Sequence, residues 1–326
     1  MTGTPKFGFV LGPEARRLSS TDAEALEATG CDSLWTGGHV IGPDTLEVLT
    51  SLARIAGMTR RVQIGTAILT LPLYPAVLVA KQFAEIDIAS GGRAALGVGV
   101  GSNDREMAAL GVNPAERGAR ADEALKIIRT LWRGEAVTRT NAWWALDNVS
   151  IAPRPEAPPI YVAGRVSAAM RRAAWLGDGW MPMLFSPNKY AKSVAEITGY
   201  AQAARRGLDG FEWLVLLFVC ADDDAAVAWK RASESLSVDT GVPPDRAQAL
   251  LGKTAAVGTA DDVAGVLTQY VQAGVTHFVL RACAPAHEYQ QQIAKVMTEV
   301  VPLVRGREAT SRDRRPTARE ESRCRS

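Results

Sequence analysis

His39 has the sequence surroundings that best fit proton chemistry among the three histidines of this chain. It follows Thr36, Gly37 and Gly38, directly after a short apolar run that predicts a strand. Glycines let the backbone pass close to a bound molecule, and an imidazole exchanges a proton near neutral pH. His39 is therefore a candidate general acid or base, or a group that polarises a bound ring. The alternative is a loop histidine held by local hydrogen bonds.

A second candidate segment is 65–72, which leaves a predicted strand with small residues and ends in a proline-containing turn. It includes Thr66, Ala67 and Ile68. Small residues at a strand end permit a bulge, or the close approach of a flat ring. Packing inside a barrel core explains the same pattern, so both interpretations stay open.

A third segment, 97–103, includes Gly99, Val100, Gly101 and Ser102. Its glycines alternate as in a dinucleotide fingerprint. The segment lacks the full G-x-G-x-x-G spacing, and no acidic residue follows at the expected distance. It therefore predicts a loop whose backbone approaches a cofactor, rather than a Rossmann site.

A fourth segment, from Ala163 through Gly164, Arg165 and Val166 to Ser167, leads from a predicted strand into a predicted helix. Amides at a helix N-terminus attract anions, and Arg165 adds a positive charge. An ordinary helix capped by Ser167 explains the same residues. Because the other ligand-like loops also follow strands, we interpret this segment as a phosphate site.

These segments need a scaffold that brings the ends of several strands together. Eight short apolar runs alternate with longer amphipathic segments, as parallel strands covered by helices do. The alternation predicts an α/β protein, a single (β/α)8 TIM barrel with insertions, whose active site lies at the carboxyl ends of the strands. The predicted strands are 7–11, 33–36, 62–69, 94–100, 160–163, 179–182, 214–220 and 276–281.

Helical periodicity and capping residues fill the intervals between these strands. Residues 134–159, rich in Trp, Asn and Pro, interrupt the alternation as an excursion. We expect one domain over residues 1–305 and a disordered tail over 306–326, which has few large apolar groups. The predicted helices are 20–29, 44–58, 75–90, 115–132, 167–176, 187–206, 222–236, 261–273 and 286–304.

Composition argues against several other classes of protein. The 37 basic and 35 acidic residues nearly balance, which favours neither a nucleic-acid nor a membrane partner. No apolar stretch approaches the ~18 residues of a membrane span, and we see no signal peptide. The four cysteines lack metal-ligand or C-x-x-C spacing, so we expect no metal site, and free thiols in the cytoplasm. No P-loop, paired-carboxylate or Ser-His-Asp pattern supports hydrolysis or phosphoryl transfer.

Several motifs occur in the order that is typical of one family, over roughly residues 6–305. Together they are specific, and the chain resembles the bacterial luciferase-like superfamily of flavin- and deazaflavin-dependent oxidoreductases. The motifs are 30–40 (GCDSLWTGGHV), 61–67 (RVQIGTA), 80–82 (AKQ) through 90–93 (SGGR), 96–101 (LGVGVG), 159–165 (PIYVAGR), 171–174 (RRAA) and 177–180 (GDGW).

The resemblance implies a barrel with the isoalloxazine or deazaflavin ring in its mouth. It implies a non-proline cis peptide at Ala67–Ile68 against the ring, and it places His39 near the reactive ring edge. The phosphate would lie on the loop before the fifth-strand helix. The implied cofactor contacts are Gly38, Thr66, Ala67, Ile68, Gly99, Val100, Gly101, Ser102, Ala163, Gly164, Arg165, Val166 and Ser167.

Two positions depart from the family pattern. Gly38 stands where many deazaflavin-using relatives carry an acid, which weakens the transfer of a detailed acid–base role to His39. Val100 stands where FMN users often carry an arginine that reaches the phosphate. Val100 therefore favours coenzyme F420, a deazaflavin, over FMN.

Three functions follow as hypotheses. The first is an oxidoreductase that transfers a hydride between a small organic substrate and coenzyme F420. The second is an FMN-dependent monooxygenase that uses O2 and reduced flavin in a pocket that excludes water. The third is a non-catalytic barrel that binds a cofactor or partner. Loops 70–73, 141–144 and 183–187 are largely apolar, which favours a moderately apolar organic substrate. Family analogy implies a homodimer.

Overall fold

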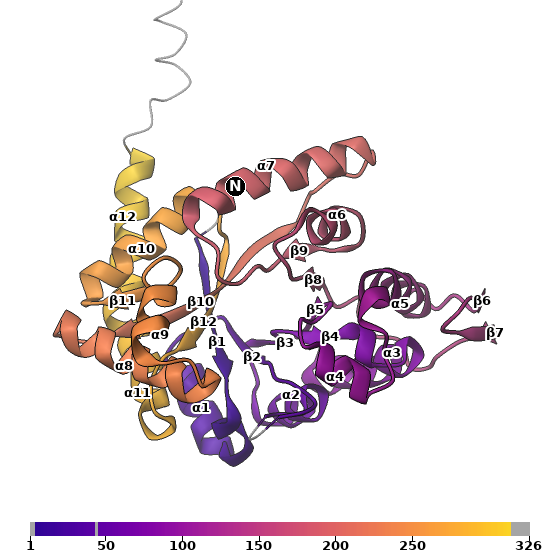
Figure 1. Cartoon of the computed structure of the whole chain (residues 1–326), viewed down its shortest axis with the longest axis horizontal. Helices are drawn as coiled ribbons and strands as arrows, with labels where there is room; N and C mark the ends of the chain where they lie inside the picture. The colour runs from indigo at the N-terminus through magenta and orange to yellow at the C-terminus, as the bar shows by residue number, and fades with distance from the viewer. Residues whose placement is uncertain (1–3, 43–44, 314–326) are drawn as a thin grey trace, which may run out of the picture.

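The structure, a computed structural model, describes residues 4–42 and 45–313. Eight parallel strands form a ring in the order β12-β1-β2-β3-β5-β8-β9-β10, and β10 pairs with β12 to close it (Figure 1). The predicted (β/α)8 barrel is confirmed. Its strands are β1 (Lys6–Leu11), β2 (Ser33–Thr36), β3 (Gln63–Thr66), β5 (Ala94–Gly99), β8 (Ile160–Val162), β9 (Gly179–Trp180), β10 (Glu212–Ala221) and β12 (His277–Ala282).

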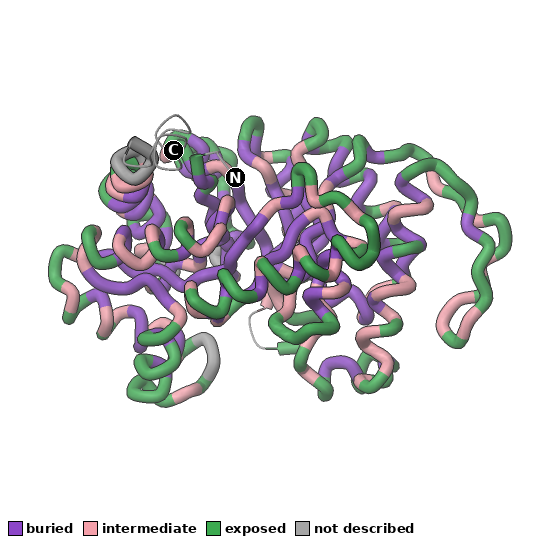
Figure 2. The backbone as a smooth tube through the Cα atoms, turned by 90° about the horizontal axis from the view of Figure 1, so that it is seen from above, coloured by how far each residue is buried: buried purple, intermediate pink, exposed green. Residues whose placement is uncertain are grey.

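The barrel strands are buried on both faces, which Figure 2 shows as a purple centre. In β1, Phe9 and Leu11 belong to the large apolar cluster that the helices share. Val10, between them, belongs to a second cluster with Trp35 and Val279 from the neighbouring strands. This two-residue alternation fills the barrel interior with side chains, so the ring is a packed frame that holds the loops at its ends.

Helices cover the outside of the ring, and several begin at side-chain caps. Ser19 closes a capping box on α1, as Thr259 does on α10. The helix predicted from residue 44 begins instead at Val48, because Glu47 accepts hydrogen bonds from the first amides, including that of Thr50. The helices are α1 (Ser20–Ala28), α2 (Val48–Met58), α3 (Ala76–Ser90), α4 (Asp104–Ala109), α5 (Arg117–Trp132), α6 (Ser167–Leu176), α7 (Pro187–Ala203), α8 (Ala225–Thr240), α9 (Pro244–Leu251), α10 (Ala260–Gln272), α11 (Tyr289–Lys295) and α12 (Val301–Asp313).

Some elements differ from the predictions. The strand predicted over 62–69 is divided into β3 and β4 (Leu69–Thr70), and the cis peptide predicted between Ala67 and Ile68 is confirmed. The sequence does not predict β11 (Ala256–Gly258), α4 or α9, which are all short and carry little periodic signal. The excursion 134–159 contains β6 (Val137–Thr140) and β7 (Ala145–Val149), an antiparallel hairpin that projects beyond α5 (Figure 1).

The domain was predicted to end at residue 305, and in the structure α12 continues past that residue to Asp313. The Arg305 guanidinium lies 5.8 Å from the centre of the Phe7 ring, and Arg307 donates a 2.8 Å hydrogen bond to the carboxylate of Asp261. These contacts hold the helix against its neighbours, and adding residues to an existing helix costs little. Residues 314–326 of the predicted tail lie outside the described part of the chain.

The described residues were also searched for membrane-spanning helices, metal-binding clusters and disulfides. None of their helices is long and apolar enough to span a bilayer, and they hold no cluster of three His, Cys, Asp or Glu side chains suited to a metal ion. Cys31 and Cys220 form no disulfide, and burial raises the pKa of each thiol to about 11. Both thiols therefore stay protonated and unreactive near neutral pH.

Candidate active site

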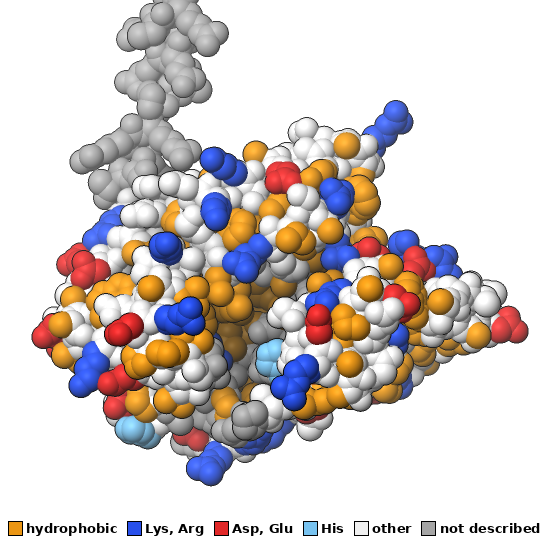
Figure 3. All heavy atoms as spheres, in the orientation of Figure 1, with side chains coloured by type: hydrophobic (Ala, Val, Ile, Leu, Met, Phe, Trp, Pro, Cys, Tyr) orange, Lys and Arg blue, Asp and Glu red, His pale blue; other side chains and the backbone are white. Residues whose placement is uncertain are grey.

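The predicted ligand loops lie at the carboxyl ends of adjacent barrel strands. The His39 loop follows β2, Ala67 follows β3, Gly99 ends β5, and Gly164 lies after β8. These four strands are consecutive in the ring, so the four segments form one arc of the barrel mouth. Figure 3 shows one face of the molecule hollowed between two groups of helices, with hydrophobic side chains inside the hollow.

Close approaches join the segments of this arc. A β-carbon added to Gly37 would lie 2.1 Å from the carbonyl oxygen of Ala67. One added to Gly99 would lie 2.8 Å from Ile68 Cδ1 and 3.8 Å from Ala163 Cβ. A side chain at Gly99 would therefore displace Ile68. With glycine at this position, no side chain projects from the backbone into the barrel mouth. The arc presents the half-buried Ile68 and bare backbone, which suits a planar ring.

Other predicted contacts support the arc rather than line it. Thr66 is fully buried, and its hydroxyl donates a 2.6 Å hydrogen bond to the carbonyl of Gly97. Beyond β5, Val100, Gly101 and Ser102 lead the chain into α4, and Val100 is half-buried while Ser102 is exposed. The backbone between β5 and α4 is fixed at its middle, because Arg117 donates a 3.2 Å hydrogen bond to the Gly101 carbonyl.

The Gly164 loop is held in place from two sides. The indole nitrogen of the fully buried Trp180 donates a 2.9 Å hydrogen bond to the carbonyl of Gly164. Arg165 donates a 3.2 Å bond to the carbonyl of Leu184. Gly164 has a φ of 127°, which a residue with a side chain rarely adopts. The loop is thus fixed in one conformation before any ligand binds.

Ser167 does not cap α6, contrary to the prediction. The N-cap is Val166, which makes no side-chain cap bond within the described chain, and Ser167 is the first helical residue. Arg165, Val166 and Ser167 are all exposed. The first amides of α6 are therefore not satisfied by a cap, and they can serve an external anion beside the positive charge of Arg165. An apolar arc joined to this helix end fits a planar ring that carries a phosphate.

His39 faces a partner that the sequence analysis missed. Its Nδ1 lies 3.0 Å from Oε2 of Glu106, on α4. The side chain of His39 is 54% exposed, whereas that of Glu106 is 2% exposed, so an accessible imidazole is backed by a buried carboxylate. The other carboxylate oxygen accepts hydrogen bonds from the amides of Val40 (2.5 Å) and Ile41 (3.1 Å). Glu106 therefore fixes both the ring of His39 and its loop.

The charge of Glu106 follows from these contacts. Burial alone raises the pKa of a carboxyl group, but the hydrogen bonds from His39, Ile41 and Val40 outweigh it and leave the pKa of Glu106 below its usual value. The group is thus ionised near neutral pH. An ionised Glu106 accepts a hydrogen bond from Nδ1–H of His39, which leaves Nε2 as the nitrogen that can exchange a proton with a ligand.

The sequence before Glu106 carries a local signal for a helix start. Asn103 is a preferred N-cap residue, and Glu106 stands three positions later, as in a capping box. The Asn103 side chain does accept a 3.2 Å bond from the Glu106 amide. In a capping box the glutamate would turn back to the cap, but here its carboxylate crosses to the His39 loop. Only the first half of the motif is therefore present.

The predicted substrate loops belong to different parts of the fold. Residues 141–144 connect β6 and β7, on the hairpin that projects beyond α5 (Figure 1). Trp143 donates a 2.8 Å hydrogen bond to Glu116, and the Trp144 ring lies under the guanidinium of Arg120. Both tryptophans thus contact residues at the start of α5. Residues 70–73 and 183–187 follow β4 and β9 and remain at the strand ends.

Several enzymes are similar to this chain in sequence. A 4-hydroxyprotoasukamycin monooxygenase from Streptomyces nodosus subsp. asukaensis is 33% identical over 248 residues, which are 68% of this chain and 65% of that protein. An F420-dependent glucose-6-phosphate dehydrogenase from Kineococcus radiotolerans is 29% identical over 312 residues, 86% of this chain and 90% of that protein. An F420-dependent hydroxymycolic acid dehydrogenase from Mycobacterium tuberculosis is 33% identical over 235 residues, 68% of this chain and 64% of that protein.

Solved structures show the same fold. An F420-dependent secondary alcohol dehydrogenase, in complex with an F420-acetone adduct, superposes with a TM-score of 0.78 at 22% identity, over 93% of this chain and 99% of that one. A monooxygenase from Streptomyces bottropensis gives a TM-score of 0.76 at 24% identity, over 91% and 99%. The family model described as luciferase-like monooxygenase matches residues 21–277. This chain belongs to the luciferase-like monooxygenase family.

Proposed function

We propose that this protein is an oxidoreductase that transfers a hydride between a small organic substrate and coenzyme F420. The observation that carries the proposal is the 3.0 Å contact between the accessible imidazole of His39 and the buried, ionised carboxylate of Glu106. Such a pair can take up and release a proton on the loop after β2, the strand next in the ring to the one that leads to Ile68.

The proposed chemistry needs both a proton and a hydride. Interconversion of an alcohol and a carbonyl compound moves a hydride from carbon and a proton from oxygen. When bound, the deazaflavin ring supplies the centre that accepts or gives the hydride. His39 takes the proton at Nε2, and the negative charge of Glu106 stabilises the imidazolium that forms. The exposed amides of α6 and Arg165 would hold the phosphate.

Two lines support coenzyme F420 as the cofactor. Relatives from Kineococcus radiotolerans and Mycobacterium tuberculosis carry F420 dependence in their names. Val100 stands where a phosphate-binding arginine is typical of FMN users, which leaves the phosphate to Arg165 and to backbone amides. An FMN-dependent monooxygenase is the second candidate, because the relative from Streptomyces nodosus is a monooxygenase. A non-catalytic barrel is the third.

Titration of the purified chain with F420 and with FMN separates these candidates. We expect saturable binding of F420 and at least tenfold weaker binding of FMN. Tight FMN binding with reductant-dependent O2 consumption would instead establish the monooxygenase. A chain that bound neither cofactor would contradict both enzymatic functions.

Replacing His39 tests the catalytic role directly. We expect His39→Ala to bind the cofactor with unchanged affinity and to lose about 100-fold or more in kcat, because the proton of the substrate hydroxyl then lacks an acceptor. Lys126→Ala, which removes an exposed side chain paired with Glu123 on α5, is the control and should retain turnover. Unchanged kcat in His39→Ala would remove His39 from the mechanism.

The cellular compartment and the oligomeric state of the protein are also proposals. We infer that the enzyme works on a small molecule in the cytoplasm, which the buried, unbridged thiols of Cys31 and Cys220 support, since a reducing compartment keeps thiols in this state. We further propose a homodimer by family analogy. Sedimentation of the purified chain tests that assembly.

A further inference from the structure

The floor of the barrel mouth is formed by the apolar cluster that fills the barrel interior. This cluster, which contains Val10 and Trp35, also contains Ala67 after β3 and Leu216 in β10. Ala67 is 9% exposed and Leu216 is 8% exposed, whereas the other buried members of the cluster are at most 3% exposed. Leu214, on the same face two residues earlier in β10, is fully buried, so exposure increases toward the carboxyl end of the strand. The mouth therefore opens onto an apolar surface.

The ring order places one side of this surface opposite the cofactor arc. β3 and β10 stand four positions apart in the ring of eight, so Ile68, which follows β3, faces β10 across the mouth. A planar ring that lay on the arc would keep one of its faces toward β10. A substrate that reacts at this face would then lie between the ring and the side chains of β9 and β10.

Met183 extends the surface from β9. It forms a parallel bridge with Leu216, and bridged residues of neighbouring strands point to the same face of a sheet. Met181, two residues earlier, belongs to the interior cluster, so strand alternation gives Met183 the same direction. Met183 is 42% exposed, whereas Met181 is 1% exposed. The flexible, apolar thioether of Met183 is thus accessible at the mouth, beside Leu216.

The backbone on both sides of Met183 is fixed. The amide of Leu216 donates a 2.9 Å hydrogen bond to the carbonyl of Pro182, which precedes Met183. Arg165 donates a 3.2 Å hydrogen bond to the carbonyl of Leu184, which follows it. The second contact ties this segment to the proposed phosphate loop. Met183 is therefore held in place before any ligand binds, which lowers the entropic cost of binding one.

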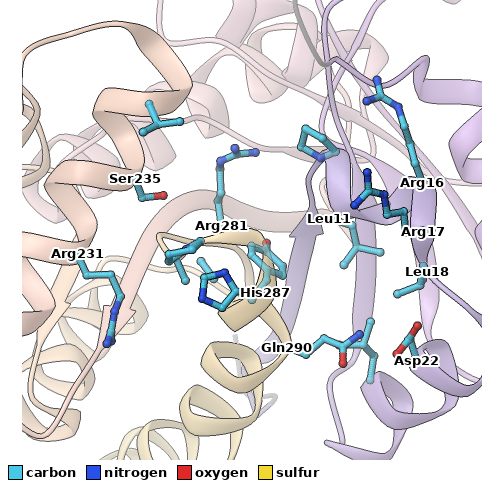
Figure 4. Close-up of a pocket in the computed structure, with 18 of the residues that line it drawn as sticks. Leu11, Arg16, Arg17, Leu18, Asp22, Arg231, Ser235, Arg281, His287 and Gln290 are labelled. Atoms are coloured by element: carbon cyan, nitrogen blue, oxygen red, sulfur yellow. The ribbon is translucent and has the colours of Figure 1, made fainter.

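The side chains that β9 and β10 turn toward the mouth carry no charge. Phe218, two residues beyond Leu216, lies on the same face and is 8% exposed. Its register neighbour in β12 is Arg281, which has other interactions in the chain and lines a separate cavity of about 960 Å³ between the ends of β1 and β12 and the helices α1, α8 and α11 (Figure 4). Met183, Leu216 and Phe218 do not line that cavity. A charged group placed against these three side chains would lose its hydration without gaining a partner.

We propose that Met183 and Leu216 form the substrate-binding wall of the active site, and that they select an alcohol or carbonyl compound that carries an uncharged, apolar group. The apolar group lies against this wall, and the reacting oxygen is left for His39. This inference rests on the proposed function. It narrows the small organic substrate to neutral molecules with an apolar end, and it assigns the selection to two named side chains.

Calorimetry with two matched probes tests the proposal on the full chain. The probes are 4-phenyl-2-butanone and 4-(3-oxobutyl)benzoate, which has the same skeleton with a carboxylate added to the ring. We expect the neutral ketone to bind at least tenfold more tightly than the carboxylate, because the wall cannot solvate the added charge. Equal binding of the two probes, tighter binding of the carboxylate, or no binding of the ketone up to its solubility limit would overturn the proposal.

Variants locate the group that discriminates between the probes. Met183→Lys should reduce the preference for the ketone at least tenfold, because it places a positive charge beside the ring carboxylate, and Met183→Leu should keep the preference. Ile88→Lys is the matched control, since Ile88 is 46% exposed on the last turn of α3, at the opposite end of the barrel. Leu216→Thr should weaken ketone binding about threefold or more. If this buried variant fails to fold, Met183→Lys retains the test, and an unchanged preference in Met183→Lys would contradict the assignment.

A final arm separates this inference from the proposed function. The titrations are repeated on protein saturated with coenzyme F420, and turnover of both probes is measured with the reduced cofactor. Equal kcat/KM for the two probes would leave the function standing and overturn the substrate wall. If F420 did not bind, but the chain still preferred the ketone and lost that preference in Met183→Lys, the wall would stand and the proposed function would fail. In the active enzyme, we expect Met183→Lys to raise the KM for the ketone more than it lowers kcat.

Discussion

At the scale of the residue, the site depends on how Glu106 controls His39. The carboxylate is buried and ionised. One of its oxygens contacts the His39 ring, and the other accepts hydrogen bonds from the amides of Val40 and Ile41. Gly38 lacks the acid that many deazaflavin-using relatives carry next to the histidine. Glu106 supplies a carboxylate to the same imidazole from another element. It is a positioning residue, since it acts through His39.

Glu106→Gln should lower kcat by about 10–100-fold while leaving the affinity for cofactor unchanged, because a neutral amide no longer stabilises the imidazolium. The parent rate and the variant rate are compared in steady-state assays over a range of pH. The matched control is Glu85→Gln, which removes an exposed carboxylate paired with Lys81 and should keep full activity. A change in KM without a change in kcat would argue that Glu106 only shapes the pocket.

At the scale of the element, the short helix α4 links the cofactor arc to the acid–base pair. It begins directly after the glycine-rich end of β5, and Asn103 caps it through the Glu106 amide. The cap fixes where the first turn starts, and this first turn carries Glu106. A six-residue helix has little stability of its own, so its cap matters more than it would in a long helix.

Asn103→Ala should lower the free energy of unfolding by about 1 kcal/mol and should also lower kcat, because the first turn of α4 then frays and releases Glu106. Thr259→Ala removes an equivalent cap on α10, outside the arc, and should cost similar stability with no loss of kcat. Chemical denaturation and steady-state kinetics of the two variants provide the comparison. Equal effects on kcat would show that the loss reflects general destabilisation.

At the scale of the whole molecule, the two ends of the barrel have different roles. At the end opposite the active site, Ser33 Oγ lies 2.7 Å from His277 Nε2, and His277 Nδ1 lies 3.1 Å from Glu212 Oε2. The arrangement resembles a hydrolytic triad, but Ser33 and His277 are fully buried, and Trp35 donates a 2.7 Å hydrogen bond to the same Ser33 oxygen. These residues begin strands and tie them together, so the network stabilises the barrel.

This network predicts the acid stability of the protein. Burial raises the pKa of Glu212, but the contacts with His277 and Lys6 outweigh it and lower the pKa to about 2 from 4.5. An acid with a depressed pKa in the folded state stabilises the fold above pH 4.5, and this stabilisation disappears as the pH falls toward 2. At about 1.4 kcal/mol per pKa unit, the contribution is on the order of 3 kcal/mol.

Glu212→Gln should therefore be less stable than the parent at pH 7, and the difference in the free energy of unfolding should shrink between pH 4.5 and pH 2. Urea unfolding at a series of pH values measures it. Glu135→Gln, which breaks an exposed pair with Arg133, should follow the parent curve closely. If the free energy of unfolding of the parent and of Glu212→Gln changed with pH in parallel, the pH dependence would come from groups other than Glu212.

The sequence by itself determined the elements that have a local signature. The eight barrel strands and most helices were predictable, because alternation and helical periodicity are written into neighbouring residues. The loops after β2, β3, β5 and β8 were equally predictable, since glycines and small residues mark strand ends. Short elements such as α4 and β11 escaped prediction, because a few residues carry too little periodicity to separate them from loop.

Only the tertiary structure decided which side chains meet. Glu106 and His39 are 67 residues apart, and Tyr289, whose hydroxyl donates a hydrogen bond to the carbonyl of Val10, is 279 residues from it. Such pairs form when the ring of strands closes and brings the first strand beside the last. The register of the barrel and the packing of its helices fix the directions in which these side chains point. Patterns among neighbouring residues in the sequence do not encode that register, so they cannot predict which side chains meet.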